Sequence, residues 1–205
     1  MTTPAELDRK LLAAVERLGR ALRVVRQQVA TRHQLSLLQV HLLELLADRR
    51  PRRVGELAAE LDVSQPTVSE AVATLQGKGL ATRRRAGDDA RAIIVALTRA
   101  GTQLATSVAA DLAPLLDGDH TTEDDERGTA LRVVLGEISR FQRAGIITIN
   151  RSCLSCLHYR APAGATQTAH CLLLDQPLGY ADLRIDCPEH GQPPGQPRLR
   201  PSPLR

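Results

Sequence analysis

The chain has 205 residues, 42% of them hydrophobic, which is enough for a well-packed domain with an appendage and excludes disorder throughout. Its formal net charge is only +4. The first ten residues lack the apolar segment of a signal peptide, and no later run is long enough to cross a bilayer, so we expect a cytoplasmic protein without a membrane partner.

Residues 5–30 predict a long amphipathic helix, because apolar side chains recur along it at steps of three and four with charged residues between them. The stripe consists of Leu7, Leu11, Val15, Leu18, Leu22, Val25 and Val29. A stripe this narrow needs a partner, and on a helix this long a second chain is a natural candidate.

Three shorter helices are predicted next. Leucines at 35–46 indicate the first, which ends at an Arg-Arg-Pro sequence. Residues 53–62 indicate a second, followed by a tight turn. Ser64 suits the N-cap of the third, which holds Pro66 in its first turn and ends near Gly77.

After Gly79 the apolar period changes from that of a helix to that of a strand. Residues 80–85 and 92–98 predict a hairpin joined by a polar loop at 86–91. One face of the second strand carries Ile93, Val95 and Leu97. Thr98 is expected to cap the next helix, and an acidic run suits the start of the last helix through the helix dipole.

This order of elements is typical of a mainly α-helical winged helix-turn-helix, in which the second helix of the pair reaches base edges in the major groove. Here that helix would face the core with Val68, Ala71, Val72 and Leu75. Its open face would carry Gln65, Pro66, Thr67, Ser69, Glu70 and Thr74. Gln65 suits adenine, Thr67 or Ser69 a base or phosphate, and Glu70 the N4 of cytosine. The alternative is an ordinary solvent-facing helix.

The positive charge is mostly arginine and gathers in two runs, at 49–53 and 83–85. Arginine clusters suit bidentate contacts with phosphate. A coding bias that replaces lysine by arginine would produce the same composition. Composition alone therefore favours a nucleic-acid partner only slightly.

Residues 54–101 resemble the DNA-binding core of MarR-type transcriptional regulators, and the likeness extends over roughly residues 5–145. The residues that carry it in the hairpin are Asp89, Arg91, Leu97, Thr98 and Gly101. The resemblance implies a homodimer held by its terminal helices, with two winged modules that read a palindromic double-stranded operator. It also implies that Arg91 enters the minor groove at the wing tip, oriented by Asp89, and arginine suits a narrow minor groove.

The chain departs from that family where many members carry a basic residue in the recognition helix, because it has Ser69 followed by Glu70. Phosphate anchoring would then fall to the arginines at 83–85 and to the run at 49–53. The predicted DNA contacts are Ser64, Gln65, Pro66, Thr67, Ser69, Glu70, Arg83, Arg84, Arg85, Asp89 and Arg91.

All the cysteines lie from residue 153 onward, in the spacing C-x2-C-x14-C-x15-C. They are Cys153, Cys156, Cys171 and Cys187. Such a set matches a closed zinc site or an iron–sulfur cluster, and zinc would help a segment poor in core-forming residues to fold. A metal-free thiol switch is a third possibility. A histidine could replace one cysteine ligand, the candidates being His158, His170 and His190.

We therefore predict three parts. Residues 1–145 would form the winged helix-turn-helix and dimerisation domain, and residues 146–190 a metal-binding segment. Residues 191–205, rich in proline and glycine, would form a disordered basic tail.

The predicted function is that of a DNA-binding repressor with a metal or redox input through the cysteines. One alternative is a regulator of the same fold that senses an organic ligand, although one Phe, two Tyr and no Trp make an aromatic pocket hard to build. Another is a zinc-stabilised protein-interaction module. We do not expect an enzyme, because neither H-E-x-x-H nor H-x-E with P-C-x-x-C occurs.

Overall fold

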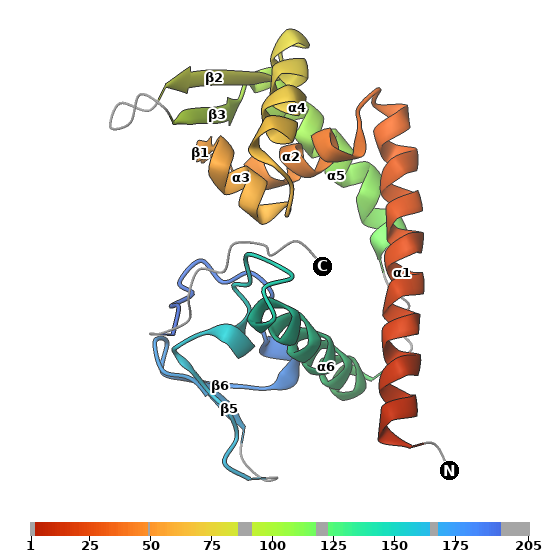
Figure 1. Ribbon diagram of the computed structural model, residues 1–205, viewed down its shortest axis with the longest axis vertical. Helices are drawn as coiled ribbons and strands as arrows, with labels where there is room; N and C mark the ends of the chain where they lie inside the picture. The colour runs from red at the N-terminus through yellow and green to blue at the C-terminus, as the bar shows by residue number, and fades with distance from the viewer. Residues whose placement is uncertain (1–2, 49, 86–91, 118–122, 165–167, 194–205) are drawn as a thin grey trace. The chain divides into compact units, whose positions relative to one another are not determined.

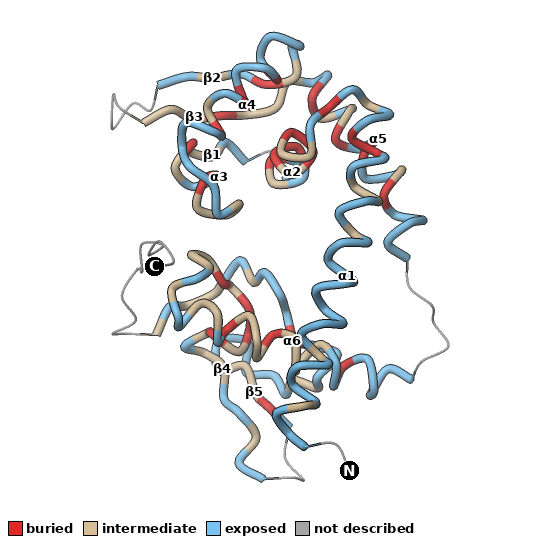
Figure 2. Tube along the Cα trace, turned by 45° about the vertical axis from the view of Figure 1, so that its right-hand side comes forward, coloured by how far each residue is buried: buried red, intermediate tan, exposed pale blue. Residues whose placement is uncertain are grey.

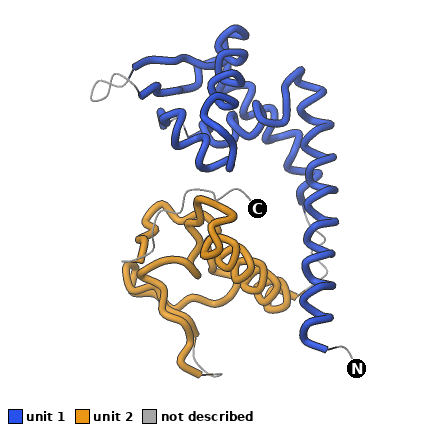
Figure 3. Tube along the Cα trace, viewed as in Figure 1, with its two compact units in different colours: residues 1–118 blue, residues 119–205 orange. Residues whose placement is uncertain are grey.

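The computed structural model describes residues 3–48, 50–85, 92–117, 123–164 and 168–193. It divides into two compact units, residues 1–118 and 119–205, which Figure 3 shows in separate colours. The boundary differs from the one expected at residue 145, because the last long helix belongs with the cysteine segment. The expected tail falls mostly outside the described residues.

Unit 1 is mainly helical with a small antiparallel sheet, as predicted (Figure 1). Its elements are α1 (Pro4–Arg32), α2 (Leu37–Leu46), β1 (Arg52–Arg53), α3 (Val54–Glu60), α4 (Gln65–Gly77), β2 (Ala81–Arg85), β3 (Ile93–Leu97) and α5 (Arg99–Leu116). The sheet has the order β1-β3-β2. Strand β1 was not predicted, because two residues are too few to show an alternating pattern.

The core of unit 1 is built from leucines and valines of α2, α3 and α4, around which β3 and α5 close. Figure 2 shows these buried stretches gathering on the short helices. The fully buried side chains include Leu42, Leu43, Leu46, Leu57, Val68, Val72, Leu75, Val95 and Val108. The predicted inner face of α4 is confirmed, since Val68, Ala71, Val72 and Leu75 are all buried. The predicted inner face of β3 is confirmed too, with Val95 buried and its neighbours on that face packed on the core.

Capping residues begin the helices where the sequence predicted. The Thr98 hydroxyl accepts a hydrogen bond from the Gly101 amide at 3.0 Å and donates to the Gly79 carbonyl at 2.8 Å. The Thr98 amide donates to the Leu80 carbonyl at 3.0 Å. Thr98 therefore ties the start of α5 to the start of the hairpin.

Of the predicted apolar stripe of helix α1, only Val29 is buried, and the other residues are half-buried or exposed. Only Val29 and Ala30 of its 29 residues are buried, while Leu7 and Leu18 are 61% and 59% exposed. No helix in the described part of the chain, α1 included, is both long enough and apolar enough to cross a membrane.

Unit 2 packs a small cysteine-bearing module on one helix. Its elements are α6 (Asp124–Arg143), the 3-10 turn η1 (Cys153–Ser155), β4 (Tyr159–Arg160), β5 (Ala169–Cys171), β6 (Gln176–Leu178) and the 3-10 turn η2 (Tyr180–Asp182). The acidic first turn of α6 is confirmed. Leu135 of α6, Cys153 and Leu183 form the buried cluster. The backbone at Tyr180 and Ala181 lies so close to Gly128 that a side chain there would meet it at about 3 Å.

We predict that Gly101→Ala lowers the free energy of unfolding by roughly 1–3 kcal/mol, because the added methyl would stand 1.9 Å from the Leu80 carbonyl oxygen. Gly77→Ala is the control, since nothing lies within 4 Å of its Cβ position and alanine favours a helix. Urea unfolding at one chain concentration measures both. Equal stability of the two variants would contradict the tight junction at Gly101.

Candidate nucleic-acid interface and cysteine pocket

The N-terminus of α4 is fixed by Ser64. The Ser64 hydroxyl accepts a hydrogen bond from the Thr67 amide at 3.3 Å and lies 2.7 Å from the Thr67 hydroxyl. Pro66 fits the first turn because it has no amide hydrogen to satisfy there. The predicted cap is confirmed, and the positive end of the α4 dipole at this point favours an anion such as phosphate.

The predicted reading residues lie on the outer face of α4. Ser64, Gln65, Pro66, Thr67 and Glu70 are exposed, and Ser69 is half-buried. The side-chain amide of Gln65 lies over α3, where a Cβ at residue 55 would approach its Nε2 to 3.3 Å. Glu70 is the only charged group of this set, so the face carries hydrogen-bonding groups rather than positive charge.

The three hairpin arginines do not point the same way. Arg83 pairs with Val95 and Arg85 with Ile93 across the ladder, whereas Arg84 pairs with Ile94 and so lies on the opposite face of β2. Arg84 and Arg85 are exposed, and Arg83 is half-buried. The predicted Asp89 and Arg91 lie outside the described residues.

Within the arginine run before α3, the Arg52 side chain is held in ion pairs. The Arg52 guanidinium lies 2.9 Å from Asp48 and 3.9 Å from Glu60, and its side chain is 26% exposed. The Arg53 amide donates to Glu56 at 2.8 Å. Arg52 therefore holds β1 to its flanking helices, and a phosphate contact there would have to break these ion pairs.

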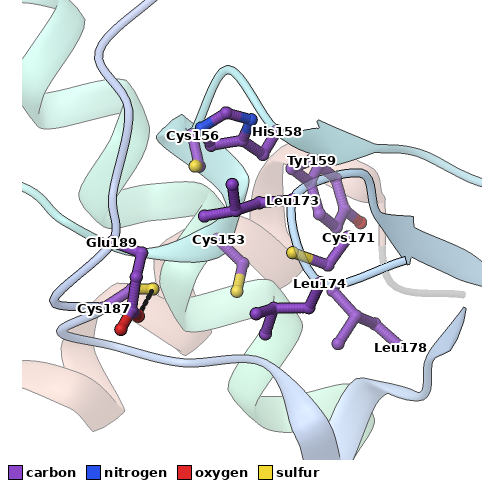
Figure 4. A pocket seen from close by; sticks show the side chains of 10 residues that line it. All are labelled: Cys153, Cys156, His158, Tyr159, Cys171, Leu173, Leu174, Leu178, Cys187 and Glu189. Atoms are coloured by element: carbon purple, nitrogen blue, oxygen red, sulfur yellow. Dashed lines mark hydrogen bonds between the residues drawn. The ribbon is translucent and has the colours of Figure 1, made fainter. Parts of the chain in front are cut away.

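The four cysteine thiols, all free, line one pocket (Figure 4). Cys153 and Cys156 flank η1, where the Cys156 amide donates to the Cys153 carbonyl at 3.0 Å. Cys171 ends β5, and Cys187 follows an isolated bridge between Arg151 and Asp186. The rest of the lining is His158, Tyr159, Leu173, Leu174, Leu178 and Glu189. Three segments far apart in sequence thus bring the predicted cysteines together.

Arg184 serves two of these sulfurs. Its backbone amide donates to Cys153 Sγ at 3.3 Å, and its guanidinium donates to Cys187 Sγ at 3.8 Å. The Cys187 thiol lies 3.5 Å from Glu189 Oε2, to which it donates. Burial raises the pKa of the Cys153 thiol, which holds it neutral, while the hydrogen bond to Cys187 raises the pKa of Arg184.

The three candidate histidine ligands differ in their contacts. His170 Nε2 lies 3.0 Å from Asp175 Oδ1, and His190 Nε2 lies 3.1 Å from the Ser155 hydroxyl, so each has its own partner. Of the three, only His158 lines the pocket. As they stand, no three His, Cys, Asp or Glu side chains within the described ranges are arranged to hold a metal ion.

A buried asparagine connects the cysteine turn to α6. Asn150 Nδ2 donates to the Ser139 hydroxyl at 3.2 Å and to Gln142 Oε1 at 3.3 Å, while its Oδ1 accepts from the Ser152 amide at 3.0 Å. Asn150 is 7% exposed. Neither Asn150 nor Arg184 was predicted, because a single Asn or Arg outside any recognisable motif gives no signal in the sequence.

Residues 33–92 match the model described as the MarR family. None of the curated proteins matches the sequence.

Three solved structures illustrate the likeness in fold. The MarR family transcription regulator SP03579 is 24% identical, with a TM-score of 0.58 over 67% of this chain and 91% of its own. BldR from Sulfolobus solfataricus is 23% identical, with a TM-score of 0.55 over 66% of this chain and 99% of its own. Reduced AbfR bound to DNA is 20% identical, with a TM-score of 0.53 over 68% of this chain and 94% of its own.

We expect Ser64→Ala to lower the free energy of unfolding by about 1 kcal/mol, because the first turn of α4 loses its cap. Thr82→Ala is a matched control, since the exposed Thr82 hydroxyl only donates to the Ala96 carbonyl beside it at 3.3 Å. Thermal or urea unfolding compares them. A Ser64→Ala protein as stable as the wild type would show that the cap contributes nothing.

Proposed function

We propose that this protein, whose residues 33–92 match the MarR family model, is a dimeric, sequence-specific DNA-binding transcriptional regulator. It would act in the cytoplasm as a repressor, by occupying an operator. The observation that carries the proposal is the capped, exposed N-terminus of α4 beside a hairpin that presents exposed arginines. The family and the similar structures are those of regulators, which supports a role other than catalysis.

The exposed residues of α4 suit a reader of base edges. Gln65 presents an amide that matches adenine, and Glu70 can accept from the N4 of cytosine. The Thr67 hydroxyl already bonds Ser64, so its role is to shape the helix end. The positive end of the helix dipole would then lie near phosphate.

The hairpin arginines supply the positive charge that α4 lacks. Arg84 and Arg85 are exposed on opposite faces of β2. Only one of the two arginines can therefore contact the same sugar-phosphate backbone. By the resemblance, Arg91 and Asp89 would extend this contact into the minor groove. The hairpin would thus provide affinity for the phosphate backbone, whereas α4 would recognise the bases.

Helix α1 supports the proposed homodimer. Its exposed stripe includes Leu7, Val15 and Leu18, and the end of α5 exposes Leu115 and Leu116. Apolar stripes of this kind are buried by packing on a second copy. Two heads related by a two-fold axis would read half-sites about 10 bp apart, in a palindromic operator.

We predict that Arg84→Ala and Arg85→Ala each weaken operator binding, and that the variant whose arginine contacts phosphate lowers the slope of log affinity against log salt by about 1. Arg160→Ala is the control, an exposed arginine on β4. Fluorescence anisotropy over a salt series measures the slopes. If neither hairpin variant differs from the control, the hairpin is not a DNA contact.

The cysteine segment supplies the proposed metal or redox input. Cys153 packs against Leu135 of α6, and Asn150 bonds the residue before Cys153 to two residues of the same helix. A change in the state of the thiols therefore acts directly on α6. AbfR supports such an input, since structures of it are described as reduced and DNA-bound and as disulfide-formed.

We predict that Asn150→Ala weakens the coupling between the chemical state of the thiols and the affinity for the operator. The variant should lose roughly 1–3 kcal/mol of stability, because buried partners of Asn150 stay unsatisfied, and the change in operator affinity on treatment with oxidant or chelator should shrink. Gln176→Ala, an exposed amide on β6, is the control. If a folded Asn150→Ala protein changes its operator affinity as strongly as the wild type on this treatment, the Asn150 hydrogen bonds do not transmit the signal to α6.

A further inference from the structure

We infer that the four cysteines bind one zinc ion as thiolates, with Arg184 as the residue that stabilises them. The inference names the chemistry of the input proposed above and rests on that proposal for its regulatory meaning. Its starting observation is that all four thiols of the chain, from three separate segments, line a single pocket. Four sulfur ligands match the closed tetrahedral coordination of structural zinc.

The size of the hollow favours a single ion. Its volume is about 20 Å³. A cavity of roughly 10–15 Å³ on this measure holds one water molecule, so the space suits one ion of similar size.

The Cys187 thiol donates to Glu189 in the structure, but two other hydrogen bonds, both from Arg184, suit thiolates. A neutral thiol is a weak acceptor, yet Arg184 aims its backbone amide at Cys153 and its guanidinium at Cys187. Donors directed at ligand sulfurs from outside the coordination sphere are characteristic of metal sites. Four cysteine thiolates and one Zn²⁺ together carry a net charge of 2−, which is partly offset by the Arg184 guanidinium, although this group also lies 3.4 Å from Glu189.

Binding would draw the thiols inward from their present positions, in which no three ligand-type side chains of the described residues meet. A cysteine side chain moves its sulfur by rotation about its Cα–Cβ bond. Each thiol loses its proton to solvent as its bond to zinc forms, which makes binding dependent on pH. Leu173, Leu174 and Leu178 line the pocket with apolar surface that limits access of water.

Histidine is the weaker ligand here. His170 and His190 already bond Asp175 and Ser155. His158 lines the pocket, but its participation would leave one of the four sulfurs without a role. The four-sulfur set uses every cysteine of the chain.

The test is the metal content of the full-length protein, purified under reducing conditions without added metal or chelator, read with its absorption spectrum. We expect a colourless protein with about one zinc per chain, and ligand-field bands of a tetrahedral tetrathiolate after exchange for cobalt. Iron with sulfide, or metal-free protein with free or disulfide-bonded cysteines, would overturn the inference. This measurement needs no variant and so does not depend on folding of a mutant.

Variants then test the role of Arg184. Arg184→Ala keeps the backbone donor to Cys153 but removes the one to Cys187, so zinc affinity measured against a chromophoric chelator should fall roughly 10–100-fold. Arg160→Ala should leave it unchanged, and His158→Ala should not lower the zinc content. Equal affinity of Arg184→Ala and Arg160→Ala would remove Arg184 from the site.

The two proposals fail separately. A protein that holds zinc but does not prefer an operator over competitor DNA would overturn the proposed function and leave the zinc site standing. A protein that binds an operator specifically but contains no zinc would overturn only the inference.

Discussion

The rotation of α4 about its own axis is the constraint on which the reading surface depends. Val68, Val72 and Leu75 are fully buried, and their spacing of three and four places them on one side of the helix. Because that side of the helix is buried in the core, Gln65, Thr67 and Glu70 face solvent. The cap at Ser64 sets where the helix begins, and Gly101 lets α5 approach the hairpin base closely enough to hold it.

In this arrangement the hydrogen-bonding side chains lie on α4, and the exposed positive charge lies on the hairpin. The outer face of α4 offers amides, hydroxyls and one carboxylate, so its contacts with phosphate come through backbone dipoles at the helix end. The exposed guanidiniums lie on β2 instead, and Arg52, which looks equivalent in sequence, is held by Asp48 and Glu60. Non-specific attraction and base reading can therefore change independently of each other.

Most of unit 1 could be predicted from the sequence, because its signals are local. Apolar residues repeat with the helical period, Ser64 and Thr98 cap helices, and β3 alternates. Strand β1 was missed since its pairing with β3 links residues about forty positions apart. The association of α6 with the cysteine module was missed for a similar reason: the apolar stripe of α6 shows that it needs a partner but does not identify one. The cysteine spacing predicted a shared site, whereas Arg184 and Asn150 act through contacts that only the folded chain brings together.

Cys153 belongs to two parts of unit 2 at once, the buried cluster with Leu135 and Leu183 and the lining of the pocket. Oxidation of its sulfur to a sulfinic acid would put a charged group among leucines, at a cost that a cluster of this size can hardly offset. Irreversible damage at that atom would then destabilise unit 2. The packing of the buried cluster would in this way depend on the chemical integrity of one sulfur atom.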